Sequence, residues 1–134
     1  MARDYMFRAR RCLREAKLAL AEKDFPGTVR RSQEALELAI KAVLRYLAIE
    51  YPREHDVGEA LTQIVDNLPS YLKKKIHSIQ TLMTELARVR GPAFYGYERE
   101  GIPAREAFSR EYAENAFEKV KEIIELCIKF LKAT

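Results

Sequence analysis

The sequence predicts an all-α fold, an antiparallel up-and-down bundle of four to five helices. Apolar residues recur at alternating steps of three and four along nearly the whole chain, as they do on the buried face of an amphipathic helix. No segment alternates apolar and polar residues as a half-buried strand would, and no repeat is present. A chain of 134 residues suits one domain, so we expect a single helical domain that spans residues 1–134.

The first two predicted helices occupy the N-terminal part of the chain. Lys23 to Gly27 closes the first helix, and the second is expected from about Thr28 to Tyr51. Pro52 ends the second because proline lacks a backbone donor and clashes with the preceding turn. The apolar stripes are Met6, Ala9, Leu13, Ala16 and Leu20 in the first helix, and Val29, Leu36, Ile40, Val43 and Leu47 in the second.

A short third helix and a longer fourth one follow. Asp56 is a natural N-cap for the third, and we expect His55 beside it to fix the turn as a structural residue. Pro69 and Ser70 break and cap the chain before the fourth helix. The fourth helix carries the stripe Leu72, Ile76, Ile79, Met83, Leu86 and Val89.

The fifth predicted helix runs from about Arg105 to Lys132 and has an unusually wide apolar face. Because this face is wider than one partner helix covers, we expect a homodimer that forms through this helix or through the rim of the preceding loop. The apolar positions are Phe108, Tyr112, Ala116, Phe117, Val120, Ile123, Ile124, Cys127, Ile128, Phe130 and Leu131.

Composition narrows the class of protein further. No apolar run approaches the 18 residues of a membrane span, and the N-terminus has no signal-type apolar core, so we expect a cytoplasmic protein with no membrane partner. Two distant cysteines, Cys12 and Cys127, indicate buried thiols rather than a disulfide framework. Asparagine and glutamine are scarce beside charged residues, a composition that weakly indicates a thermophile.

Arginines crowd the N-terminus, and the net charge is +4. Cations at a helix N-terminus oppose the helix dipole, so local stability does not account for them. They either meet an acidic partner such as nucleic acid or are solvated side chains whose stems cover a neighbouring helix. The arginines are Arg3, Arg8, Arg10, Arg11 and Arg14.

Several kinds of active site are excluded by the residues themselves. Neither His55 nor His77 lies in a nucleophile motif, and neither belongs to the Glu-x-x-His pattern of a carboxylate-bridged metal bundle. Gly91, Gly96 and Gly101 do not follow a strand, so they are no phosphate-cradling loop. We therefore expect no metal and no cofactor.

Two polar features remain as candidate sites. The stretch RVRGPAFYGYEREGIP, from Arg88 to Pro103, is too long and too aromatic for an ordinary helix connection, which indicates a lid, a binding surface or a disordered flap. On the second helix, the spacing of Gln33, Glu37 and Lys41 by four places them on one stripe. This stripe is either part of a binding groove or an ordinary exposed Glu–Lys pair.

Four short motifs follow one another along the chain: SQEALELAIKAVL in the second helix, EHD after it, RGPAFYG from Arg90 onward, and REYAENAFEKV at the start of the last helix. In their order and spacing the chain resembles the HEPN domain (higher eukaryotes and prokaryotes nucleotide-binding). The resemblance implies a bundle of four to five helices, usually a two-fold dimer. Many members of the family are metal-independent ribonucleases, often toxins paired with a small nucleotidyltransferase antitoxin, and the resemblance implies a groove that faces nucleic acid or nucleotide.

The resemblance places the functional residues in the long loop. The ribonuclease signature of the family is Arg, four to six residues, then His, supplied by both protomers to a groove at the dimer interface. Here Arg90 matches the arginine, but Tyr95 stands where the histidine is expected, and an ordinary tyrosine with a pKa of about 10 is a poor base. Tyr97 matches the tyrosine to which a partner nucleotidyltransferase adds adenylate.

Two functions therefore remain open. The first is a dimeric, non-catalytic module that binds nucleotide, RNA or a partner protein, and the second is a divergent ribonuclease toxin in which Arg90 and Tyr95 are the candidate catalytic residues. A loop that merely packs in a structural dimer is the third possibility. The predicted binding residues are Arg88, Arg90, Tyr95, Tyr97, Glu37 and Lys41.

Overall fold

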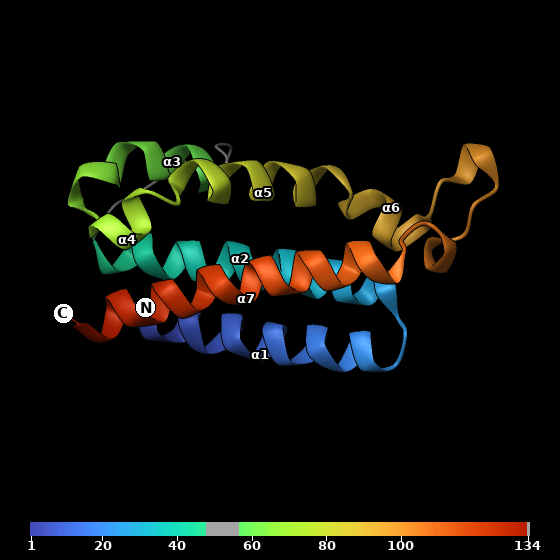
Figure 1. Ribbon diagram of the computed structural model, residues 1–134, viewed down its shortest axis with the longest axis horizontal. Coiled ribbons are helices and arrows are strands. Elements are labelled where there is room, and N and C mark those ends of the chain that lie inside the picture. Colours follow the sequence, from blue (N-terminus) through green and yellow to red (C-terminus); the bar gives the residue numbers. More distant parts are fainter. Residues whose placement is uncertain (48–56, 134) are drawn as a thin grey trace.

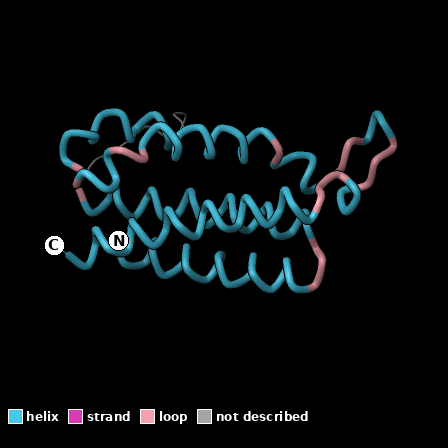
Figure 2. Tube along the Cα trace, in the orientation of Figure 1, coloured by secondary structure: helices cyan, strands magenta, loops and turns pink. Residues whose placement is uncertain are grey.

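The computed structural model describes residues 1–47 and 57–133, which form seven α-helices and three short 3-10 helices with no β-strand. Helices α1 (Ala2–Ala21) and α5 (Ile76–Arg88) run in one direction, and α2 (Phe25–Tyr46) and α7 (Arg110–Ala133) run in the other (Figure 1). Both termini lie at the same end of the molecule (Figure 2). The predicted class, an all-α antiparallel bundle, is confirmed.

Helix α2 is the central element of the bundle. It contacts α1, α7 and α5, together with the short helices α3 (Val57–Ile64) and α6 (Arg90–Tyr95). A further short helix, α4 (Ser70–Lys73), packs on α7. Among the described helices, none is long and apolar enough to cross a membrane. The 3-10 helices are η1 (Val65–Asn67), η2 (Glu98–Glu100) and η3 (Ala104–Glu106).

The predicted apolar stripes form the core. Burial of a leucine or isoleucine side chain contributes about 1.5–3 kcal/mol, so these stripes hold the helices together. The wide face of α7 is used within the chain, because α7 packs on α1, α2 and α4 and buries both Phe117 and Ile124. The largest fully buried side chains include Leu36, Ile40, Leu44, Leu61, Ile64, Ile79, Leu86, Val120 and Ile124.

Helix α2 begins earlier than the sequence suggested. Phe25 to Gly27 were assigned to the connection, but they form the first turn of α2. The carboxylate of Asp24 accepts a hydrogen bond from the Gly27 N–H at 2.9 Å, which satisfies a free donor of the first turn. Pro26 fits there because the first turn needs no donor from it. The prediction of Thr28 as the start was therefore wrong.

Other helix ends also differ from the prediction. Helix α2 ends at Tyr46 rather than Tyr51. The predicted single helix after Pro69 is broken into α4 and α5, and Ser70 is the first residue of α4 rather than a capping side chain. The predicted structural turn at His55 and Asp56 lies outside the described residues.

The last helix begins at Arg110 and not at Arg105. Residues Ala104–Glu106 form the separate 3-10 helix η3. The hydroxyl of Ser109 then accepts a hydrogen bond from the Tyr112 N–H at 3.0 Å, which is the geometry of an N-cap. A serine three residues before an aromatic was a usable signal, and the prediction missed it.

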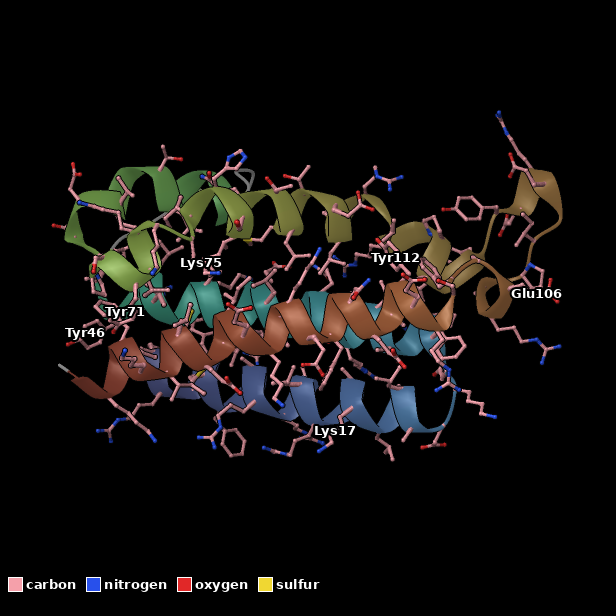
Figure 3. All side chains as sticks on the ribbon, viewed as in Figure 1. Lys17, Tyr46, Tyr71, Lys75, Glu106 and Tyr112 are labelled. Atoms are coloured by element: carbon pink, nitrogen blue, oxygen red, sulfur yellow. The ribbon has the colours of Figure 1, made fainter. Side chains whose placement is uncertain are left out.

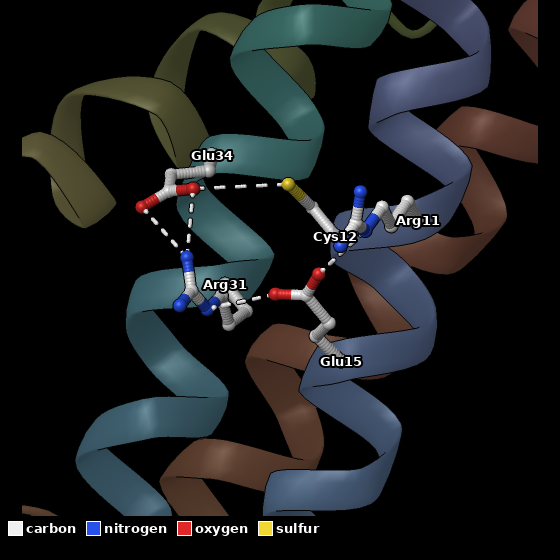
Figure 4. Close-up of polar contacts among 5 residues, drawn as sticks. All are labelled: Arg11, Cys12, Glu15, Arg31 and Glu34. Carbon is white, nitrogen blue, oxygen red and sulfur yellow. Dashed lines mark hydrogen bonds and ion pairs between the residues drawn. The ribbon is translucent and has the colours of Figure 1, made fainter.

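A polar network joins α1 to α2 (Figure 4). Arg31 on α2 contacts Glu15 on α1 at 3.1 Å and Glu34 on its own helix at 3.2 Å. The Cys12 thiol donates to Glu34 across the helix pair, with 3.7 Å between sulfur and oxygen. Both cysteines were predicted to be buried, which holds for Cys127, whereas Cys12 is half-buried in this network.

Candidate functional site

The segment predicted as a long loop begins with a helix. Only Val89 separates α5 from α6. Pro92 has no N–H for the carbonyl of Arg88 four residues earlier, so α5 cannot run straight through it. The Ala93 N–H still donates to the Val89 carbonyl at 3.0 Å, which keeps α6 attached to the end of α5. Helix α6 packs on α2 and thereby fixes where the rest of the segment starts.

Gly96 ends α6 and closes the segment. Its φ angle is 71°, in the left-handed region that favours glycine. A Cβ atom at this position would lie 2.7 Å from both the Pro103 carbonyl carbon and the Ala104 nitrogen. Only glycine therefore lets the two ends of the segment meet at this point.

The remaining residues form a small hairpin that projects from one end of the bundle (Figure 1). The Tyr97 N–H donates to the Ile102 carbonyl at 2.8 Å, and the Ile102 N–H donates back at 3.0 Å. Gly101, with φ 69°, makes the turn after η2. The segment is thus an ordered structure and not a disordered flap.

An open hollow of about 340 Å³ lies between α6 and this hairpin. Tyr95 and Tyr97 both line it, and both phenol rings reach solvent, with exposed fractions of 69% and 37%. The structure thus brings together these two predicted binding residues. The full lining is Gly91, Pro92, Tyr95, Gly96, Tyr97, Glu98, Arg99 and Glu100.

Arg90 is the first residue of α6 and directly precedes the lining residues Gly91 and Pro92. Its side chain is exposed and makes no hydrogen bond or ion pair with any residue that the structure describes. A free guanidinium offers five donors in a planar fork that suits phosphate. Arg90 is therefore available for an anion that reaches the hollow.

Arg88 is in a different state, because Glu85 already binds it. The Arg88 guanidinium donates to both carboxylate oxygens of Glu85, at 2.7 and 3.2 Å. The Tyr112 hydroxyl on α7 donates to the same carboxylate at 2.9 Å (Figure 3 labels Tyr112). This cluster of Glu85, Arg88 and Tyr112 ties the end of α5 to the start of α7.

The pKa values of the cluster follow from these contacts. Burial, followed by the hydrogen bond to Glu85, raises the pKa of Tyr112 to about 12. Hydrogen bonds from Arg88 and then Tyr112 lower the pKa of Glu85, and Glu85 raises the pKa of Arg88. At neutral pH Tyr112 is consequently neutral, Glu85 anionic and Arg88 cationic.

Phe94 marks the contact of α6 with α2. The Arg30 guanidinium lies over the Phe94 ring, 4.3 Å from its centroid, while half of the Phe94 side chain remains exposed. The Phe94 ring also lies 5.9 Å from that of Tyr95. The Phe94 ring thus lies between Arg30 of α2 and the exposed ring of Tyr95 in the sequence of contacts.

The polar stripe on α2 is satisfied within itself. The Gln33 amide donates to Glu37 at 2.9 Å, and Lys41 forms an ion pair with Glu37 at 3.3 Å. Helical spacing puts Glu37 and Lys41 on the same face as Arg30. Arg30 is the residue of this face that contacts the segment, through Phe94. Among the described residues, Glu37 and Lys41 have no recorded contact with the segment.

A family model described as HEPN domain matches residues 2–131, nearly the whole chain. The chain belongs to the HEPN domain family. No curated protein and no solved structure matches it significantly. The family supports a nucleotide-binding or ribonuclease-like module in general. Within this HEPN domain the family motif RGPAFYG coincides with α6 and the first residues of the hollow.

No histidine lines the hollow among the described residues, and the carboxylates that line it are those of Glu98 and Glu100. Tyr95 stands five residues after Arg90 and lines the hollow, and Tyr112 holds its proton up to a pH of about 12. His77, the one histidine of the described part, lies near the start of α5. Eleven residues of helix separate it from Arg88, which is about 16 Å along the axis.

Three residues of this site escaped the sequence reasoning. Glu85 stands three positions before Arg88, which is the spacing of an ion pair on one helix face and was readable from the sequence. Tyr112 meets Glu85 across 27 residues, and Arg30 meets Phe94 between two helices. No local pattern shows such contacts, because they depend on how the helices pack.

Proposed function

We propose that this HEPN domain is a dimeric module that binds a nucleotide or RNA at the hollow between α6 and the hairpin, and that it lacks a complete ribonuclease site. Two observations carry the proposal: two exposed tyrosines line the hollow, and the exposed, unpaired Arg90 directly precedes the lining residue Gly91 in the chain. An arginine fork binds phosphate oxygens, and a phenol ring can stack on a base. These are the two chemical parts of a nucleotide.

The proposal assigns different roles to the predicted residues. Arg90 binds phosphate, and Tyr95 and Tyr97 contact the base or sugar. Arg88 holds the end of α5 in place through its ion pair with Glu85, and it is not assigned to the ligand. Glu37 and Lys41 support α2 beneath α6 and do not touch the ligand.

Catalysis is left out of the proposal for a physical reason. Cleavage of RNA through its 2′-hydroxyl needs a group that accepts a proton near neutral pH. Tyr112, with its pKa of about 12, does not meet that need, and Tyr95 stands where the resemblance to the family expects the catalytic histidine. Arg90 can still stabilise phosphate charge, so binding remains when catalysis is lost.

The dimer belongs to the same proposal. The wide face of α7 no longer argues for it, because that face is buried inside the chain. The exposed apolar rim of the segment, which consists of Phe94, Tyr95, Tyr97 and Ile102, is the better interface. A two-fold contact there brings two copies of the hollow together.

A nucleotidyltransferase partner is the second candidate, and the exposed Tyr97 hydroxyl position favours it. Tyr97 stands at the tyrosine that accepts adenylate in related toxins, and it reaches solvent at the hollow. This alternative requires ribonuclease activity that the modification silences. It therefore predicts cleavage by the unmodified chain.

Fluorescence anisotropy tests the binding role. A labelled mononucleotide and a labelled single-stranded RNA are titrated at two salt concentrations with wild type, Arg90→Ala, Tyr97→Phe and the control Arg45→Ala, which removes an exposed cation of α2. We expect Arg90→Ala to weaken binding roughly tenfold or more, because hydrogen bonds to charged groups contribute about 1.5–3 kcal/mol. We expect no change with Arg45→Ala.

The same RNA, incubated with a metal chelator, tests the ribonuclease alternative. We expect it to stay intact. Metal-independent cleavage that Arg90→Ala abolishes would favour the toxin function instead. Binding that is equal in wild type and Arg90→Ala would remove the hollow as the binding site.

A further inference from the structure

The outward face of α1 carries cations without partners. Helical spacing puts Arg3, Arg10, Arg14 and Lys17 within about one sixth of the helix circumference. All four are exposed, and none forms an ion pair with any described residue. Lys17 points away from the bundle, and nitrogen-tipped side chains follow the outer edge of α1 (Figure 3).

The acidic residues of α1 do not neutralise this face. Asp4 pairs with Arg8, and Glu15 pairs with Arg11 and with Arg31 of α2. The pairs of Glu15 lie on the flank of α1 that turns toward α2 (Figure 4). The helix therefore separates its charges into a paired flank and an unpaired basic face.

Apolar side chains stand within the basic face. Phe7 is 63% exposed and Leu18 is 60% exposed, because both lie on the side of α1 that faces away from its core stripe. Helical spacing places the exposed Phe7 ring beside Arg3, Arg10 and Arg14. The combination of cations and one flat ring is the pattern of a surface that tracks a phosphate backbone and stacks on a base.

We propose that this face of α1, defined by Arg3, Phe7, Arg10, Arg14 and Lys17, binds a single-stranded polynucleotide. It is a second surface, separate from the hollow, because α1 lies on the opposite side of α2 and α7 from α5 and α6 (Figure 1). The proposal stands on the charges of α1 alone and does not require the hollow to bind anything.

Two other occupants fit the observations less well. A second copy of this chain would set the same arginines against each other across a two-fold axis, and like charges repel. A membrane surface requires a broad apolar face, but the broad apolar face of α1 is already buried in the core. Phe7 and Leu18 alone give little area for insertion.

The dimensions suit a polymer better than a mononucleotide. From Arg3 to Lys17 the helix rises about 21 Å, at about 1.5 Å per residue. A single mononucleotide reaches one of these cations at a time, whereas consecutive phosphates of a strand reach several. Binding at this face must therefore depend on strand length and on salt.

A pair of matched triple variants tests the proposal. Arg3→Gln/Arg10→Gln/Arg14→Gln removes three charges from the face, and Lys73→Gln/Lys74→Gln/Lys119→Gln removes three exposed charges elsewhere. Both variants lower the formal net charge from +4 to +1. The probes are labelled single-stranded RNA, single-stranded DNA and a duplex, measured by anisotropy over a range of salt concentrations. Melting curves verify that each variant folds.

We expect the arginine triple to weaken single-strand binding at least tenfold and to make the slope of log affinity against log salt shallower by about two, since each phosphate contact contributes about 0.7 for single strands. Phe7→Ala should weaken single-strand binding and leave duplex binding unchanged. The lysine triple should keep the wild-type slope. Its melting temperature and that of the arginine triple should be no lower than that of wild type.

Several results would overturn the proposal. Equal slopes of log affinity against log salt for the two triple variants would contradict it. Binding to phosphatidylserine vesicles that depends on the arginines, without binding to any polynucleotide, would also contradict it. A change of oligomeric state in the arginine triple alone would point to a second copy instead. Repeating the comparison with Arg90→Ala added separates the two surfaces: the difference between the triples must persist there, whether or not the hollow binds.

Discussion

Glu85 connects two helices through one carboxylate, since it accepts hydrogen bonds from Arg88 on its own helix α5 and from Tyr112 on α7. The ion pair itself is exposed and therefore contributes little to stability. The Tyr112 contact is half-buried and long-range, so it restrains the helix from which α6 and the hollow extend. Two residues that the sequence reasoning passed over thus set the position of the predicted site.

Tyr112 makes a prediction about pH. Its pKa is raised to about 12, so the folded state favours the neutral phenol. The stability that this shift contributes is complete below the ordinary pKa of about 10 and is lost as pH rises from there through about 12. We expect the free energy of unfolding of Tyr112→Phe to fall less steeply with pH in this window than that of wild type. Near neutral pH we expect it to be lower than that of wild type by about 1 kcal/mol, because a hydrogen bond is lost.

Denaturant unfolding at pH 7, 9, 10 and 11 measures this pH dependence of the free energy of unfolding. Tyr95→Phe is the control, because Tyr95 is exposed and makes no hydrogen bond that the structure records among the described residues. Parallel curves for wild type and Tyr112→Phe above pH 10 would contradict the assigned hydrogen bond.

Cys12 makes a second prediction at this scale. Burial first, then the nearby charge of Glu34, raises the pKa of its thiol above the ordinary value. The thiolate is the reactive form, so Cys12 should react with iodoacetamide more slowly than a free thiol at pH 8. Glu34→Gln should accelerate the reaction, as followed by mass spectrometry of the labelled peptide. An unchanged rate would show that Glu34 does not act on Cys12.

At the scale of elements, the sequence predicted interiors better than ends. The stripes of α1, α2, α5 and α7 are buried as expected, because the 3.6-residue period is a direct consequence of helix geometry. Helix starts at Phe25 and Arg110 were missed, because a proline in a first turn and a serine cap depend on backbone geometry that composition only hints at. The break between α4 and α5 has no signal that we can identify.

The three glycines of the segment give a matched test of its closed shape. We expect Gly96→Ala to destabilise by about 2–3 kcal/mol, because it combines a left-handed backbone with a collision against residues 103 and 104. Gly101→Ala should cost about 1 kcal/mol, since its φ angle is 69° but its surroundings are open. Gly91→Ala should be neutral or slightly stabilising, since it lies in a helix with open space around it.

Thermal denaturation of the three variants ranks them directly. The order Gly96, Gly101, Gly91 from most to least destabilising is the expected result. Equal melting temperatures for Gly96→Ala and Gly91→Ala would mean that the hairpin does not close against η3 in solution.

At the scale of the whole molecule, the family and the architecture were readable from the sequence, but the surface was not. Three of the four motifs lie at α2, α6 and α7, whereas EHD lies outside the described residues, and a model of the family matches nearly the full chain. The predicted reason for a dimer, the wide face of α7, failed because burial by α1 and α4 cannot be seen in one helix alone. The sequence likewise did not show that Arg88 is bound by Glu85, which also contacts Tyr112 of α7, whereas Arg90 is unpaired among the described residues.

The proposed dimer is testable by light scattering. We expect about twice 15.6 kDa for wild type and the monomer mass for Tyr95→Asp/Ile102→Asp, which places two charges in the apolar rim. Leu18→Asp, at an equally apolar and exposed position on α1, should stay dimeric. A mass of 15.6 kDa for wild type at micromolar concentration would contradict the dimer.

The claim that the hollow binds a nucleotide is tested most directly by an NMR titration of the isotope-labelled protein with a mononucleotide, which is too short to engage several cations of α1. We predict saturable amide shifts confined to residues 90–102, greatest at Gly91, Gly96 and Tyr97, and lost in Arg90→Ala. Saturable shifts elsewhere with none in residues 90–102, or the same shifts in Arg90→Ala, would contradict the account.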